Sequence, residues 1–126
     1  MTNPHKGRTG VSRVLRATGH SLAGMRAAYR HERAFRQEVW LAVLMVPASF
    51  LLGRNWIEIA LLAGTVVIVL IVELLNSGIE TAIDRISLDL HVLSGRAKDY
   101  ASAGVALSLV LCVAVWLAAL WQRFSS

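Results

Sequence analysis

The chain has 126 residues, of which 56 % are hydrophobic, and its mean hydropathy is +0.55. A domain of this length has too small a core to hide so much apolar surface, so the composition indicates a membrane protein rather than a soluble one. The formal net charge is +5 without zinc-ligand spacing or a basic patch interleaved with aromatic residues, so we expect no nucleic-acid partner. A single cysteine, Cys112, excludes an internal disulfide.

The N-terminal part of the chain is basic and amphipathic. Apolar residues recur there at steps of three or four with arginines between them, which is typical of a helix lying on a membrane surface. We expect this surface helix over about residues 10–33, with a break where Gly19 and Ser21 end one helix and cap the next. The simplest interpretation of its arginines is that they anchor the chain to anionic lipid.

Three apolar segments follow, and they predict membrane spans over about residues 35–53, 56–82 and 98–122. Most Lys and Arg residues lie before residue 38 or between the second and third spans. The positive-inside rule therefore places the N-terminus and the second connection in the cytoplasm, and the C-terminus outside. The sequence thus predicts an all-α membrane protein: one domain, residues 1–126, with three transmembrane helices and an N-terminal amphipathic surface helix.

The second span ends in the sequence VELLNSGIETAID, which carries a polar stripe. Glu73, Asn76, Glu80 and Asp84 stand at i, i+3, i+7 and i+11, which is one face of an α-helix, with Ser77 beside them. An ionised carboxylate inside a span is unfavourable unless it is paired or hydrated, so Glu73 must face protein or water. Hydrogen bonding between helices would explain one or two of these side chains. A whole stripe favours a cation, a proton or a positively charged partner.

Other polar residues on the predicted cytoplasmic side extend this group. Glu32, just before the first span, and Glu80 are candidate ligands for Mg²⁺, which prefers oxygen atoms and shares them with substrate phosphates. Lys98 offers a point charge to phosphate, and Glu73, lying deeper, is a candidate general base for a lipid hydroxyl. These parts suit phosphoryl transfer. A non-enzymatic helical oligomer, whose acidic stripe lines a hydrated path, remains an alternative.

Three segments together resemble the small bacterial integral-membrane diacylglycerol kinases. They are ELLNSGIETAIDR (residues 73–85), HVLSGRAKD (residues 91–99) and ERAFRQE (residues 32–38), and the resemblance extends over roughly residues 11–124. It implies a homotrimeric helical bundle in the inner membrane, with active sites shared between neighbouring subunits. This family differs in fold from soluble lipid kinases, and the chain has no GxxxxGK[ST] loop.

The resemblance also implies roles for individual residues, with Glu73 as the general base. The implied catalytic residues are Glu73, Asn76, Lys98 and Asp99, and the implied metal-binding acids are Glu32 and Glu80. The implied ATP contacts are Arg13, His20, Glu32, Glu80, Asp89, Leu90, His91, Lys98 and Asp99. The implied lipid-substrate contacts are Arg13, Arg26, Glu38, Glu73, Ser102, Trp116 and Trp121. His20 and Leu90 stand where family members carry tyrosines.

These observations lead to one expected activity. We expect a kinase that uses ATP and Mg²⁺ to phosphorylate 1,2-diacylglycerol to phosphatidate by direct in-line transfer, in the recycling of diacylglycerol into phospholipid. Its expected location is the bacterial inner membrane, which it crosses several times, with membrane lipids as further partners. Undecaprenol kinase, a relative of the same architecture, is the alternative, because the chemistry of the residues does not separate the two lipid alcohols.

Overall fold

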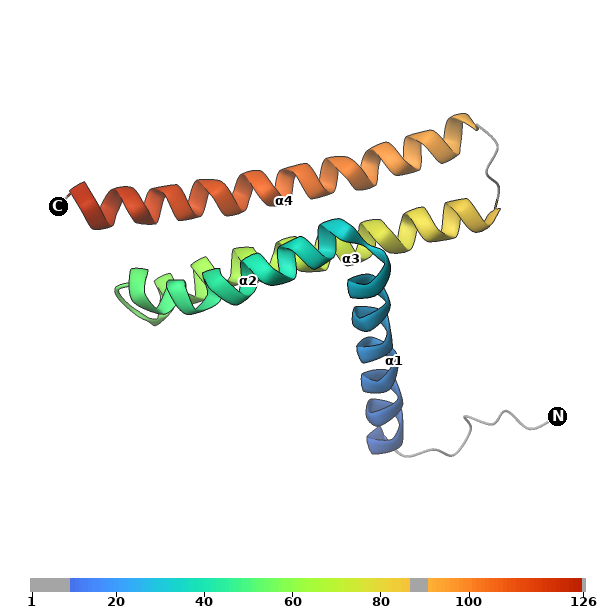
Figure 1. The fold of residues 1–126 in the computed structure, drawn as a ribbon, viewed down its shortest axis with the longest axis horizontal. Coiled ribbons are helices and arrows are strands. Elements are labelled where there is room, and N and C mark those ends of the chain that lie inside the picture. The colour runs from blue at the N-terminus through green and yellow to red at the C-terminus, as the bar shows by residue number, and fades with distance from the viewer. Residues whose placement is uncertain (1–9, 87–90, 126) are drawn as a thin grey trace.

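A computed structural model describes residues 10–86 and 91–125, and all of its regular secondary structure is helical. In chain order the helices are α1 (Gly10–His31), α2 (Arg33–Leu52), α3 (Trp56–Ile86) and α4 (Val92–Ser125) (Figure 1). The last three are long and apolar enough to cross a membrane. The predicted all-α architecture with three candidate spans and an N-terminal helix is therefore confirmed.

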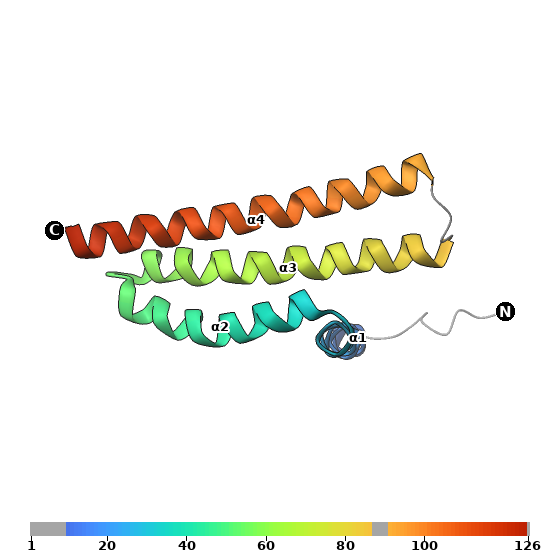
Figure 2. The same ribbon diagram turned by 45° about the horizontal axis from the view of Figure 1, so that its top comes forward.

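Helix α1 turns away from the other three helices, which run side by side. In Figure 1 it projects away from them, and in Figure 2 it is seen almost end-on beside the start of α2. Hydrophobic residues such as Val11, Leu15 and Leu22 are exposed along it, as expected of a helix whose apolar face rests on lipid rather than on protein. The amphipathic sequence thus forms a helix with few partners in its own chain.

The predicted break at Gly19 is wrong, because α1 is continuous from Gly10 to His31. The Ser21 hydroxyl does not cap a new helix. It donates to the carbonyl oxygen of Ala17 at 2.9 Å, and Thr18 donates to Val14 at 2.8 Å, so both hydroxyls bond within the helix. A glycine inside a helix costs about 1 kcal/mol relative to alanine, which the neighbouring helical residues offset here.

Helix α3 is the central helix of the bundle. Its buried residues Val66 and Val69 pack with Cys112 of α4 and with partly buried side chains of α2, and Leu62 is buried as well. In the most apolar stretch of α3, 28 % of the residues are buried, compared with 11 % in α2 and in α4. The remaining apolar surface is available to lipid tails or to other subunits. Buried hydroxyls are satisfied locally: Thr65 and Ser108 each donate to the carbonyl three residues earlier.

Trp116 fastens α4 to α3. Its indole Nε1 donates to the carbonyl oxygen of Leu62 at 3.1 Å, although 54 residues separate the two in the sequence. The Leu62 carbonyl also accepts the Thr65 hydroxyl at 2.9 Å. A bond of this kind has no competition from water in an apolar surrounding, so it helps to fix the register of the two helices.

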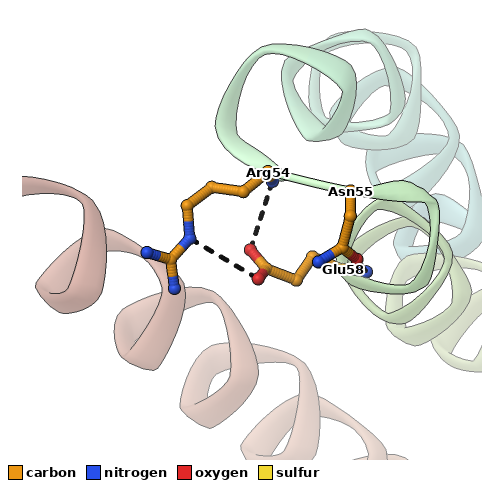
Figure 3. A network of polar contacts seen from close by, with 3 residues as sticks. All are labelled: Arg54, Asn55 and Glu58. Carbon is orange, nitrogen blue, oxygen red and sulfur yellow. Dashed lines mark hydrogen bonds and ion pairs between the residues drawn. The ribbon is translucent and has the colours of Figure 1, made fainter.

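A short polar turn joins α2 to α3 (Figure 3). The Asn55 side chain accepts the backbone N–H of Glu58 at 3.0 Å and so caps the first turn of α3. The Glu58 carboxylate accepts the backbone N–H of Arg54 at 3.2 Å and lies 3.5 Å from its guanidinium. Gly53 is tightly enclosed, because a Cβ there would lie 2.6 Å from Ile59 Cγ1 and 2.9 Å from the Ile59 nitrogen. The turn therefore has no room for a larger residue at position 53.

The two long helices exceed the thickness of a bilayer. With 31 and 34 residues, α3 and α4 measure about 46 and 51 Å at 1.5 Å per residue, whereas the hydrocarbon core is about 30 Å thick. Figures 1 and 2 show that their connected end extends well past the junction of α1 and α2. Several turns of both helices thus stand beyond the level of the surface helix.

The Gly53 turn predicts a matched pair of substitutions. Gly53→Ala forces the Ile59 backbone to move, so we expect a loss of about 1 to 3 kcal/mol of unfolding free energy, as for other overpacked sites. The measurement is the midpoint of SDS-induced unfolding in mixed micelles. Gly64→Ala is the control, because a Cβ at Gly64 meets nothing within 4 Å. An unchanged midpoint for Gly53→Ala would contradict the steric argument.

Candidate functional site

Glu73 lies at the centre of a group of carboxyl groups. It is one of the few buried charged residues of the described chain, with 6 % of its surface exposed, and Ser77 is buried one turn further along α3. The carboxyl groups of Glu73 and Glu38 of α2 interact directly. The charges of Glu32 and Glu80 also reach Glu73. Four acids from two helices and one interhelical junction therefore share a single electrostatic environment.

Two oxygen atoms in this region are buried without a hydrogen bond to the described residues. They are Oε2 of Glu38 and Oδ1 of Asn76. Buried polar atoms are nearly always paired in folded proteins, so an unpaired pair beside Glu73 favours a polar group from outside the chain at this position. The periodicity of the stripe predicts that Asn76 lies near Glu73, but it gives no sign that Glu38 reaches the same place.

Glu32 occupies the junction between α1 and α2. Its backbone is extended, with φ −112° and ψ 110°, so it interrupts the helical path between His31 and Arg33. Its side chain lines a groove of about 990 Å³ between α1 and the end of α3. The α3 side of this groove includes Ser77, Thr81 and Arg85. The groove reaches Ser77, which lies beside the acidic stripe, but Glu73, Asn76, Glu80 and Asp84 do not line it.

Lys98 pairs with the end of the stripe. Its Nζ lies 2.8 Å from Oδ1 of Asp84, which joins α4 to α3 across 14 residues of sequence. Glu80, one turn before Asp84, is also within electrostatic reach of Lys98. Sequence reasoning placed Asp84 on the stripe but did not identify it as the partner of Lys98. The spacing of i and i+11 puts Asp84 on the same face of α3 as Glu73, so it was a sequence signal that Asp84 belongs to the polar group that Lys98 meets.

The remaining nucleotide candidates lie around this end of the bundle. His91 precedes α4, and its Nδ1 accepts the backbone N–H of Leu93 at 3.1 Å. Asp99 is exposed beside Lys98, while Asp89 and Leu90 lie outside the described residues. Arg13 and His20 are exposed on α1, and within the described part of the chain no hydrogen bond or ion pair joins them to the acids.

The lipid candidates are more widely spread. Arg26 is exposed on α1 and Ser102 is exposed near the start of α4. Trp116 bonds to Leu62, which precedes Glu73 by about 16 Å of helix. Trp121 lines an apolar hollow with Leu117 and Phe124 near the end of α4. Within one chain, these two tryptophans are separate from the acidic group.

The side chains near Glu73 suit a hard cation. Mg²⁺ is usually held by one or two carboxylates together with waters and substrate phosphates, rather than by a closed cage of protein ligands. Among residues 10–86 and 91–125, no three His, Cys, Asp or Glu side chains are grouped closely enough to hold a metal alone. The oxygen-rich set with unpaired buried atoms therefore fits an ion shared with a nucleotide, and does not fit a structural metal site.

Comparison with known proteins gives a consistent result. Residues 19–120 match the family model described as prokaryotic diacylglycerol kinase. A Pseudomonas aeruginosa protein named diacylglycerol kinase is 49 % identical over 114 residues, which are 90 % of this chain and 93 % of that protein. Proteins of the same name from Haemophilus influenzae and Escherichia coli K12 are each 44 % identical. They cover 86 % and 92 % of this chain, and 92 % and 95 % of their own lengths.

The family match covers more than half of the chain, and it includes α2, α3, the acidic stripe and Lys98. It agrees with the resemblance found in the sequence and with a bundle of three apolar helices. A kinase family also decides against the non-enzymatic oligomer. The chain therefore belongs to the prokaryotic diacylglycerol kinase family.

Proposed function

We propose that the protein transfers the γ-phosphoryl group of ATP to the free hydroxyl of 1,2-diacylglycerol, giving phosphatidate and ADP. The main support is that Glu73 is buried, interacts with Glu38 and is within reach of the charges of Glu32 and Glu80. On α3 it lies about three turns before Asp84, the partner of Lys98. Acids that bind a cation, a base at the depth of a lipid hydroxyl and a lysine for phosphate are what this reaction needs. A single integral-membrane domain, residues 1–126, carries the activity.

Glu73 is the proposed general base. The lipid hydroxyl loses its proton to a Glu73 oxygen as the hydroxyl oxygen attacks the γ-phosphorus. The bond from that phosphorus to the β–γ bridging oxygen then breaks, and ADP leaves with the electron pair. The proposed transfer is direct, without a phospho-enzyme: the thiol of the single cysteine, Cys112, is buried in the apolar core against Val66 and Val69. Asn76 beside Glu73 is proposed to orient the reacting groups.

Glu32 and Glu80 are the proposed ligands of Mg²⁺. When bound, this ion would neutralise charge on the transferring phosphates. Lys98 and Asp99 are the proposed contacts for the nucleotide, and the 2.8 Å bond to Asp84 holds the lysine near Glu80. The further proposed ATP contacts are Arg13, His20, Asp89, Leu90 and His91. Arg26, Glu38, Ser102, Trp116 and Trp121 remain proposed contacts for the lipid.

The proposed setting is the bacterial inner membrane. The excess of Lys and Arg near the N-terminus and around the second connection supports a cytoplasmic N-terminus and a periplasmic C-terminus. ATP is then available on the side where Lys98 and Glu80 lie. A homotrimer is supported by the large exposed apolar faces of α3 and α4 and by the separation of the two tryptophans from the acids within one chain. The role served is the return of diacylglycerol to phospholipid synthesis.

The choice of lipid alcohol is tested directly. Purified protein in mixed micelles is incubated with labelled ATP and Mg²⁺, together with either diacylglycerol or undecaprenol. We expect label in phosphatidate and little in undecaprenyl phosphate. Labelling of undecaprenol alone would replace the proposed substrate by the alternative one. Labelling of neither lipid would end the proposal.

The role of Glu73 predicts a large and selective loss. Glu73→Gln keeps the size of the side chain but cannot accept the proton, so kcat should fall by about 10²- to 10⁴-fold with little change in KM for ATP. Glu58→Gln is the matched control, because it makes the same change at the opposite end of α3. Steady-state kinetics at saturating diacylglycerol measure both variants. Activity of Glu73→Gln equal to that of Glu58→Gln would exclude Glu73 as the base.

The role of Lys98 predicts weaker nucleotide binding. Lys98→Met removes a point charge from the phosphates, so we expect KM for ATP to rise about tenfold or more, corresponding to one charged hydrogen bond. Arg123→Met removes a positive charge from the last turn of the same helix and serves as the control. Nucleotide titrations of initial rate provide the test. A normal KM in Lys98→Met would show that Asp84, rather than ATP, is the only group that needs this lysine.

A further inference from the structure

At the junction between α1 and α2, Arg36 and Trp40 of α2 make hydrogen bonds to α1 that have no part in the proposed reaction. Only Glu32 separates α1 from α2, and its extended backbone turns the chain by a large angle. Its N–H donates to Ala28 at 2.8 Å, and its carbonyl accepts the Arg36 N–H at 3.1 Å. The direction of the Glu32 carboxylate is therefore set by how α1 and α2 are held against each other.

Arg36 fastens the end of α1 to the first turn of α2. Its Nη1 donates to the carbonyl oxygen of Tyr29 at 2.9 Å and to that of Arg30 at 3.2 Å. Carbonyls in the last turn of a helix lack partners within the helix, and a cation there also interacts favourably with the helix dipole. Arg36 thus caps α1 from the neighbouring helix.

Trp40 adds a second connection to the same residue. Its indole Nε1 donates to the Tyr29 hydroxyl at 3.1 Å. Trp40 stands four residues after Arg36, so both side chains project from one face of α2 toward Tyr29. Two independent donors on α2 therefore meet the backbone and the side chain of Tyr29, on either side of the turn at Glu32.

We propose that Arg36, assisted by Trp40, is a positioning residue that fixes the Glu32 carboxylate for the metal–nucleotide complex. The inference rests on the proposed function, since it assigns Glu32 to the metal. It differs from lipid anchoring, because the Arg36 guanidinium is used by backbone carbonyls of its own chain. Arg33, three residues earlier, is exposed and has the same charge. It is therefore the natural comparison.

The test compares Arg36→Gln with Arg33→Gln in lipid nanodiscs. Hydrogen–deuterium exchange over residues 28–32 reports the junction itself, whatever the activity. We expect exchange about tenfold faster than wild type in Arg36→Gln, because this variant loses two charge-assisted hydrogen bonds. Exchange in Arg33→Gln should equal that of the wild type. The Mg²⁺ concentration for half-maximal rate should rise about tenfold in Arg36→Gln, as it does when a residue that orients a metal ligand is removed. At saturating Mg²⁺, kcat should remain close to that of the wild type.

Each result has a definite meaning. Unchanged exchange in Arg36→Gln would show that the Arg36 bonds to α1 do not hold the junction. Faster exchange with an unchanged Mg²⁺ requirement overturns the positioning role. A lower kcat with a normal Mg²⁺ requirement does so as well, because it indicates a purely structural effect. If Arg36→Gln does not fold, Trp40→Phe replaces it, and wild-type exchange in that variant overturns the proposal. A wild-type protein without kinase activity ends the proposed function, while the exchange comparison still tests whether Arg36 stabilises the junction of α1 and α2.

Discussion

The high free energy of a carboxylate in an apolar medium is the constraint on which this structure depends. An acid at the centre of a spanning helix costs about 3 kcal/mol in membrane insertion. The charges of Glu32 and Glu80 add repulsion at Glu73. Such a group is stable only where other helices cover it and where protons, cations or water can reach it. Helices α2 and α3, with α1 beside the start of α2, provide this position. The same arrangement lowers the free-energy cost of the carboxylates and leaves them within reach of protons, cations or water.

The two ends of the bundle differ in how firmly their helices are held together. At one end, the Arg54–Glu58 pair, the Asn55 cap and the enclosed Gly53 hold α2 and α3 in a tight turn. At the other end, α3 and α4 extend past the surface helix, and the exposed Lys98–Asp84 ion pair joins them. Exposed ion pairs contribute little to stability, typically below about 1 kcal/mol. The Lys98–Asp84 pair therefore adds little to the stability of this end of the bundle.

Local patterns in the sequence were sufficient for much of this architecture. Hydropathy predicts the three apolar helices, and the 3.6-residue period predicts that Glu73, Asn76 and Glu80 share a face, because both properties are internal to one helix. The break expected at Gly19 fails for a related reason: one glycine is a weak signal against the helical preference of its neighbours. The family was also recognisable from short motifs, since each motif is one continuous segment of the sequence.

Contacts between helices were beyond the reach of these patterns. The meeting of Glu38 with Glu73 depends on the register of α2 against α3, and the bonds from Arg36 to Tyr29 depend on the angle at Glu32. Neither quantity has a periodic signature. The Trp116 bond to Leu62 is similar, because nothing in the sequence indicates which carbonyl a tryptophan on another helix will find. Packing decides these contacts.

The excess length of α3 makes the protein sensitive to bilayer thickness. From Trp56, where the helix begins, to Glu73 there are about 26 Å of rise, slightly less than a hydrocarbon core of about 30 Å. Measured from Trp56, Glu73 thus lies about 4 Å inside the far edge of such a core. A thicker membrane would place it deeper among the acyl chains, at a cost of fractions of a kcal/mol for each ångström of mismatch. The depth of this one carboxyl group would then follow the thickness of the membrane that the chain crosses.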